Sequence, residues 1–144
     1  MFIEIHFQSG KPTYLQIVDQ VKTAVASGRL REGDALLGIR PLAERLRINR
    51  NTVAKAYTEL ERQGVVATQA GKGCFIAESA SPFNNEVRER MLLEAIDAAI
   101  VEAHHLQVTD EAFLDAVQKR LQLYAKKKQE TNATDDVESR EAKR

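Results

Sequence analysis

The chain has 144 residues, 43% of them hydrophobic and 29% charged, with a formal net charge of zero at pH 7, which fits one small globular domain with an appendage. Because no apolar run approaches the roughly 20 residues that span a bilayer and no signal-peptide pattern begins the chain, we expect a cytoplasmic protein without a membrane partner. Cys74 is the only cysteine, which excludes an internal disulfide.

The first predicted elements are an N-terminal arm and a helix. Ile3, Ile5 and Phe7 alternate with polar residues, a pattern that predicts a short strand or an extended arm buried along one edge. From about Thr13 to Ser27 an apolar stripe recurs at helical spacing, and Gly28 follows as a helix end. This stripe predicts a helix that packs in the core.

The next segment predicts a helix-turn-helix. Apolar residues repeat at helical spacing before and after Ile48, so two helices could share one apolar seam. Asn49 is the expected N-cap of the second helix, which should run from Arg50 to about Gln63 and end at Gly64. The seam consists of Leu42, Leu46, Val53, Ala56, Tyr57 and Leu60.

Two short strands should follow the second helix. The segments Val65 to Thr68 and Cys74 to Ala77 have the composition of strands, and Gly71 and Gly73 surround Lys72 in the turn between them. Such a permissive turn can press a cation toward a phosphate or into a DNA minor groove. The two strands therefore predict a wing.

Residues 1–78 thus predict a winged helix-turn-helix, and double-stranded DNA is the expected partner. Arg50 begins the second helix, where an arginine can bond bidentately to guanine, although a phosphate contact is the alternative. Asn51 could read adenine, support the cap or touch phosphate. Thr52 is expected to position the backbone of the DNA, with Lys55 on the same side one turn further on.

Positive charge concentrates on this unit. Residues 1–79 hold 11 basic and 8 acidic side chains, a net charge of +3, whereas residues 80–144 hold 10 and 13, a net charge of −3. Residues 39–73 alone hold 7 basic and 3 acidic side chains. Because DNA contact needs a local basic patch, the overall neutrality does not exclude DNA binding.

From Leu42 to Ala77 the sequence reads LAERLRINRNTVAKAYTELERQGVVATQAGKGCFIA. It resembles the GntR family of bacterial transcription regulators, whose DNA-binding domains share a pattern close to LAxxLxVSRxTVxxAxxxLxxxGLVxxxxGxGTFV. The match extends upstream to about Lys11, and the segments PTYLQI and NTVAKAY look most like the small YtrA-type subfamily. The resemblance implies a winged-helix DNA-binding domain followed by a short helical dimerisation segment.

Two positions depart from the family pattern. The family commonly has Leu-Pro-Ser-x-Arg before the helix-turn-helix. Here the arginine is retained, so the resemblance implies that Arg40 contacts the DNA backbone, whereas Gly38 replaces the serine and can offer only its amide. Arg47 stands where the family has glycine, and a left-handed non-glycine residue costs on the order of 1 kcal/mol. Either the turn differs, or the extra cation compensates by reaching a phosphate. The expected DNA-binding residues are Arg40, Arg45, Asn49, Arg50, Asn51, Thr52, Lys55, Gly71, Lys72 and Gly73.

The C-terminal part predicts a hinge, two helices and a tail. Residues 79–83 contain small residues and Pro82, which predict a hinge. Residues 84–125 predict a helical hairpin whose second helix begins at Thr109 and reaches Tyr124, and whose apolar faces cannot all be covered within one chain. Residues 126–144 are lysine-rich and then mixed in charge, and we expect them to be disordered.

The uncovered apolar faces predict a homodimer. Two copies related by a twofold axis would read an inverted repeat, and the family resemblance implies the same architecture. A small-molecule effector could reorient the two parts about the hinge, and no residue identifies it. The expected dimerisation residues are Leu92, Ile96, Ala99, Ala103, Leu114, Val117, Leu121 and Tyr124.

Motifs for catalysis are missing from the sequence, so we expect neither an enzyme nor a cofactor. His104 and His105 point about 100 degrees apart on a helix, and we expect packed or solvated histidines, with metal sensing as the alternative. Cys74 is expected as a wing-strand residue, with a redox switch as the alternative.

The leading hypothesis is a mainly helical, dimeric, sequence-specific transcription regulator that represses by occluding a promoter. Two alternatives stay open. One is a winged-helix module that binds another protein, and the other is a nonspecific DNA-binding protein, whose affinity would depend steeply on salt and hardly on sequence.

Overall fold

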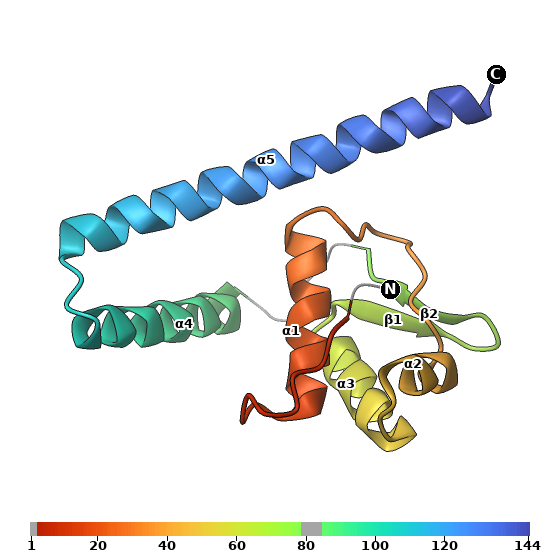
Figure 1. Ribbon diagram of the computed structural model, residues 1–144, viewed down its shortest axis with the longest axis horizontal. Coiled ribbons are helices and arrows are strands. Elements are labelled where there is room, and N and C mark those ends of the chain that lie inside the picture. The colour runs from red at the N-terminus through yellow and green to blue at the C-terminus, as the bar shows by residue number, and fades with distance from the viewer. Residues whose placement is uncertain (1–2, 79–84) are drawn as a thin grey trace. The chain divides into compact units, whose positions relative to one another are not determined.

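The computed structural model describes residues 3–78 and 85–144, and the chain divides into two compact units, Met1–Ser81 and Pro82–Arg144. The mainly helical fold with a small antiparallel sheet is confirmed (Figure 1). The predicted hinge, residues 79–83, lies outside the described residues. In chain order the elements are α1 (Thr13–Ala26), α2 (Ile39–Leu46), α3 (Arg50–Arg62), β1 (Val66–Gln69), β2 (Gly73–Ile76), α4 (Asn85–His105) and α5 (Asp110–Ala142).

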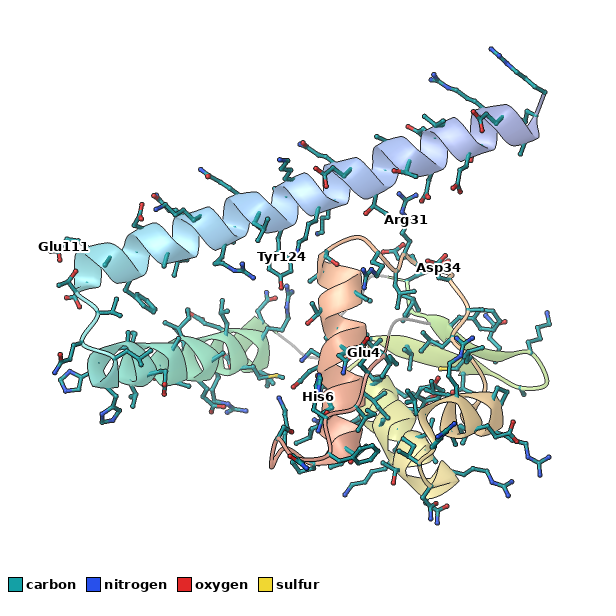
Figure 2. All side chains as sticks on the ribbon, viewed as in Figure 1. Glu4, His6, Arg31, Asp34, Glu111 and Tyr124 are labelled. Carbon is teal, nitrogen blue, oxygen red and sulfur yellow. The ribbon has the colours of Figure 1, made fainter. Side chains whose placement is uncertain are left out.

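The N-terminal arm is held by two glutamine side chains of α1, beside which Glu4 and His6 lie (Figure 2). The amide of Gln16 accepts from the His6 backbone N–H at 2.9 Å and donates to the His6 carbonyl at 3.1 Å. The amide of Gln20 makes the same pair of bonds with Glu4, at 3.0 and 2.6 Å. Because each amide offers a donor and an acceptor as a neighbouring strand would, the segment stays extended and Ile3 enters the core. Of the two predicted forms, the extended arm is the one observed.

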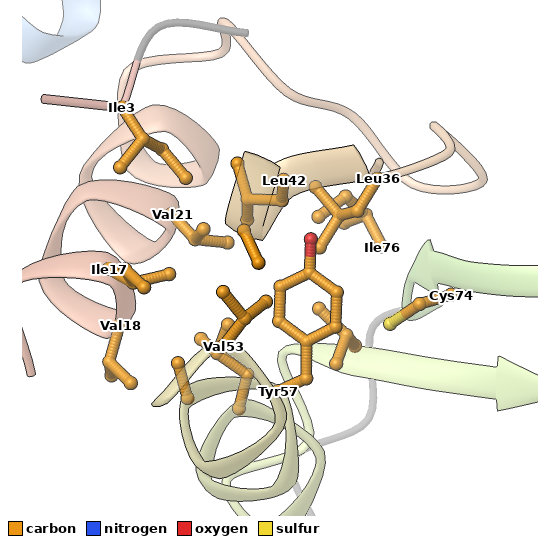
Figure 3. Packing of buried hydrophobic residues seen from close by; sticks show 14 residues of the cluster. Ile3, Ile17, Val18, Val21, Leu36, Leu42, Val53, Tyr57, Cys74 and Ile76 are labelled. Atoms are coloured by element: carbon orange, nitrogen blue, oxygen red, sulfur yellow. The ribbon is translucent and has the colours of Figure 1, made fainter. Parts of the chain in front are cut away.

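One hydrophobic core joins the arm, the first three helices and the wing (Figure 3). The predicted seam is confirmed, since Val53 and Leu60 are fully buried against Leu42 and the stripe of α1. Tyr57 is a core residue, and its hydroxyl donates to the Leu37 carbonyl at 2.6 Å. Burial raises the pKa of Tyr57 far above its ordinary value. The prediction fails for Phe7, which alternates with Ile3 and Ile5 in the sequence but is 70% exposed.

The turn between α2 and α3 fixes how these two helices cross. Arg47 ends α2 in the left-handed region, with φ 55° and ψ 47°, a conformation that costs a non-glycine residue on the order of 1 kcal/mol. The chain then turns, and the Ile48 N–H donates to the Ala43 carbonyl at 3.1 Å. Asn49 caps α3 as predicted, because its side chain accepts from the Asn51 N–H at 2.7 Å. The turn thus keeps the geometry that the glycine of the family pattern would adopt without strain.

The wing is an antiparallel pair in which Val66 lies opposite Ile76 and Gln69 lies opposite Gly73. Strand β1 begins one residue later than predicted and β2 one residue earlier. A hydrogen bond still joins the predicted outer ends, since the Ala77 N–H donates to the Val65 carbonyl at 2.9 Å. The turn closes through the Lys72 N–H, which donates to the Gln69 carbonyl at 3.0 Å. It leaves Lys72 at the tip.

A third extended segment pairs with β2 on the side away from β1. The Leu36 N–H donates to the Cys74 carbonyl at 2.9 Å, and the Ile76 N–H donates to the Asp34 carbonyl at 2.8 Å. Ala35 forms an isolated antiparallel bridge with Phe75. This pairing ties the chain before α2 to the wing, and it was not predicted because its partner lies about forty residues away in sequence.

The second unit contains the two predicted helices. Thr109 caps α5, since its side chain accepts from the Ala112 N–H at 3.2 Å. However, the helices do not close into a hairpin core, because no residue of α4 or α5 is buried. Among the described residues, no helix combines the length and the apolar character needed to cross a bilayer.

The prediction of a disordered tail over residues 126–144 is wrong, because α5 continues to Ala142 instead of ending near Tyr124. This segment contains neither proline nor glycine, and Ala, Lys, Glu, Gln and Arg are strong helix formers. Lys126 and Glu130 also lie one turn apart, with charged atoms at 4.0 Å. Helix propensity therefore outweighs the polar composition on which the prediction rested.

We predict that Gln16→Leu destabilises the first unit by about 2 kcal/mol, because Gln16 is buried and its loss leaves arm polar groups without partners. The matched variant Gln20→Leu removes bonds that are exposed and should cost less than about 1 kcal/mol. Urea denaturation followed by tyrosine fluorescence measures both values. Equal losses for the two variants would contradict this account of the arm.

Candidate nucleic-acid interface

The N-terminal end of α3 and the turn before it form a basic concavity. Its lining residues are Arg40, Ala43, Glu44, Arg47, Ile48, Asn49, Arg50 and Asn51. Three guanidinium groups and one carboxylate thus face the same space. Within residues 3–78 and 85–144, no carboxylate forms an ion pair with any of these three arginines. The concavity therefore has an excess of uncompensated positive charge, which suits a polyanion.

Local structure explains why these side chains gather. Arg40 lies in the first turn of α2, whose preceding residue, Gly38, provides no side-chain cap. Arg50 and Asn51 lie in the first turn of α3, and the left-handed turn at Arg47 brings the end of α2 beside that turn. The N–H groups at the start of a helix carry partial positive charge. Side-chain and backbone charge at this end of α3 therefore have the same sign.

The concavity gathers four of the residues predicted to bind DNA, namely Arg40, Asn49, Arg50 and Asn51. It also contains Arg47, which was not among them. The sequence had already raised a phosphate contact for Arg47, as one of two explanations for the missing glycine of the family pattern. Of the other predicted residues, Arg45 is exposed on α2 outside this lining and Thr52 is half-buried.

Lys55 lies one turn further along α3 and stacks on an aromatic ring of α1. Its Nζ lies 4.1 Å from the centre of the Tyr14 ring, a cation–π contact that restricts where the ammonium group can point. Tyr14 belongs to the apolar stripe of the predicted first helix, and no sequence pattern links it to Lys55. The structure therefore adds Tyr14 as a residue that positions a candidate DNA contact.

The C-terminal half of α3 has the opposite electrostatic character. Arg62 donates to the Glu59 carboxylate at 2.6 Å, and hydrogen bonds from Arg62 and then Gln63 lower the pKa of Glu59 to about 2. Glu61 adds a further carboxylate to this half. Because carboxylates repel phosphates, the N-terminal half of α3 is the end suited to meet DNA.

The tip of the wing presents Lys72 between two glycines. Gly71 and Gly73 have φ values of 74° and 113°, which side chains rarely adopt. The space around both glycines is open, since a Cβ added at either would meet nothing within 4 Å. Backbone conformation, rather than crowding, therefore accounts for glycine on both sides of the lysine.

The remaining groups with potential chemistry are Cys74 and the histidine pair. Cys74 is buried, and burial raises the pKa of its thiol, which favours an unreactive wing-strand residue over a redox switch. The rings of His104 and His105 lie edge to face, with centres 5.7 Å apart. In the part of the chain that the structure describes, no three His, Cys, Asp or Glu residues gather as a metal site would need.

The sequence is similar to bacterial transcription regulators along most of its length. The family described as bacterial regulatory proteins, gntR family, matches residues 13–76. The HTH-type transcriptional repressor YtrA of Bacillus subtilis (strain 168) is 39% identical over 106 residues, which are 74% of this chain and 82% of that protein. The uncharacterized HTH-type transcriptional regulator YhcF of the same strain is 36% identical over 111 residues, which are 77% and 91% of the two proteins.

Solved structures share the fold. A transcriptional antiterminator from Listeria monocytogenes EGD-e has a TM-score of 0.74 and 36% identity, with 86% of this chain and 92% of that chain covered. YtrA from Sulfolobus acidocaldarius, a GntR-family transcription factor, has a TM-score of 0.58 and 33% identity, with 70% and 99% covered. Since these alignments extend beyond residue 76, the likeness includes part of the C-terminal unit. The chain therefore belongs to the GntR family of bacterial regulatory proteins and is a DNA-binding transcription regulator.

Proposed function

We propose that the protein is a cytoplasmic repressor that binds an inverted-repeat operator as a homodimer. This proposal is carried by the arginine cluster around the N-terminal end of α3, with which no described carboxylate forms an ion pair, in a chain whose C-terminal helices leave their apolar faces uncovered. The first feature provides contact with DNA. The second provides the pairing that two half-sites require.

In the proposed complex the N-terminal turn of α3 enters the major groove. Arg50 is the base reader, because its guanidinium can donate two hydrogen bonds to O6 and N7 of guanine. Asn51 lies beside it and can reach an adjacent base edge. The side-chain oxygen of Asn49, Oδ1, already accepts the cap hydrogen bond, so the side-chain NH₂ group is what remains for a phosphate.

Phosphate contacts surround this central pair. Arg40 lies in the concavity at the start of α2, where the first helix of a helix-turn-helix crosses the DNA backbone. The Tyr14 ring restricts where the ammonium group of Lys55 can point. Thr52 helps to position the DNA backbone beside Lys55. Lys72 reaches phosphate or the minor groove from the tip of the wing, with the Gly71 and Gly73 amides close by. Arg45 contributes from the exposed side of α2.

The apolar faces of α4 and α5 support dimerisation. Leu92 is 61% exposed, Leu114 is 64% exposed and Leu121 is 66% exposed. Full burial of one such side chain is worth roughly 1.5–3 kcal/mol, so a partner that covers these faces gains considerable stability. The predicted set also includes Ile96, Ala99 and Ala103 on α4 and Val117 and Tyr124 on α5.

A second copy suits these faces in shape and charge. On α5, residues spaced three and four apart form an apolar groove that consists of Phe113, Ala116, Val117, Arg120, Leu121 and Tyr124. Helix α4 carries five acidic and two basic residues, a net charge of −3. The middle of α5 carries five basic residues, Lys119, Arg120 and residues 126–128, of which Lys119 pairs with Asp115 at 2.8 Å and Lys126 lies 4.0 Å from Glu130. We therefore infer that α5 of one protomer packs on α4 of its partner.

Arg50→Ala is expected to weaken binding to the operator by about 1–3 kcal/mol and to weaken binding to scrambled duplex DNA by less. The reason is that a base contact is lost only where the matching base is present. Lys72→Ala is the comparison, because a phosphate contact should lower both affinities alike. Competition fluorescence anisotropy at fixed salt gives the two ratios. If Arg50→Ala lowers both affinities equally, Arg50 contacts phosphate and does not read a base.

Leu121→Glu is expected to weaken the dimer by on the order of 100-fold, because it places a charge in an apolar interface. Val137→Glu is the matched control, since Val137 lies on the same helix, is 56% exposed and lies outside the proposed interface. Sedimentation equilibrium measures both. A monomeric wild type at tens of micromolar, or a Leu121→Glu protein that stays dimeric, would refute the proposed interface.

A further inference from the structure

Arg47 keeps a strained backbone where the fold favours glycine. Its φ of 55° places it in the left-handed region, and in the described part of the chain the only other non-glycine residue with positive φ is Gln107. The remaining positive φ values belong to six glycines. Backbone strain of this kind persists where the surrounding structure imposes it, and strained residues cluster at functional sites.

The surroundings of Arg47 indicate what its side chain can do. Its side chain is exposed and lines the basic concavity together with Arg40, in the first turn of α2, and Arg50, the first residue of α3. Glu44 lines the same space, yet it forms no ion pair with Arg47 in the described residues. In residues 3–78 and 85–144, the guanidinium of Arg47 therefore has no acidic partner that would explain its position.

The place of the turn in a helix-turn-helix identifies the partner. The first helix crosses the DNA backbone and the second enters the groove, so the turn that joins them passes the phosphates that border the groove. A guanidinium can donate two parallel hydrogen bonds to one phosphate. We propose that Arg47 binds a DNA phosphate at the edge of the major groove, beside the place where the N-terminal end of α3 enters it. The proposal rests on the DNA-binding function of the chain.

The decisive variant is Arg47→Gly, because it removes the cation and the strain together. The urea midpoint should stay unchanged or rise, since glycine adopts the left-handed conformation freely. Affinity should fall on the operator and on scrambled DNA alike. The slope of log affinity against log salt should decrease by about 0.9, so the change between 50 and 200 mM salt shrinks about 3.5-fold. A structural role alone would lower stability without changing the slope.

Two further variants separate charge from strain. Arg47→Gln keeps the strain and removes the charge, so it should show the same loss of affinity without a gain in stability. Gln107→Gly relieves the strain at the other left-handed residue and leaves the concavity intact, so its affinity and salt slope should match the wild type.

An Arg47→Gly protein with wild-type affinity and salt slope would overturn the proposal. A lower affinity with an unchanged slope would also overturn it, because the loss would then come from a shift of α3 rather than from a phosphate contact. Wild-type protein that retains no duplex DNA would overturn the DNA-binding function itself, and the proposal with it.

Discussion

The burial of one face of α3 is the constraint on which the rest of the molecule depends. Val53, Ala56 and Leu60 must pack against the core, so the rotation of the helix about its axis is fixed. The turn at Arg47 and the cap at Asn49 then fix where the helix begins. With rotation and starting point both set, the same few side chains always project from its N-terminal end. Recognition is thus determined by packing on the opposite face.

Charge on α3 follows from this division. The N-terminal half has Arg50 and a cap that engages only one of its free N–H groups, whereas the C-terminal half has Glu59 held by Arg62 and a further acid at Glu61. A neutral chain can therefore present a strongly positive end to DNA, because the field near a surface depends on the closest charges. The acidic excess beyond residue 79 lowers the net charge of the whole protein, but it does not remove the local excess of positive charge at this end of α3.

The parts of the fold that depend on neighbours in sequence were predictable. The seam of α2 and α3 and the Asn49 cap follow from spacing over a few residues, and the structure confirms them. Contacts between distant segments were not predictable, since nothing near Ala35 or Tyr14 signals pairing with Phe75 or Lys55. The predicted end of α5 near Tyr124 was wrong for another reason. The polar composition of residues 126–144 suggested disorder, but their helix propensity extends α5 to Ala142.

The central claim is that two copies of α3, held at a fixed separation by the C-terminal helices, read a repeated sequence. Selection of binders from randomised duplex DNA by the full-length protein at near-physiological salt tests it most directly, followed by affinity measurements on the selected site and on a scrambled one. The account predicts an enriched inverted repeat with half-sites about one helical turn apart or a multiple of it, and on the order of 1000-fold tighter binding than to the scrambled duplex. Retention that falls steeply with salt and enriches no sequence would contradict it.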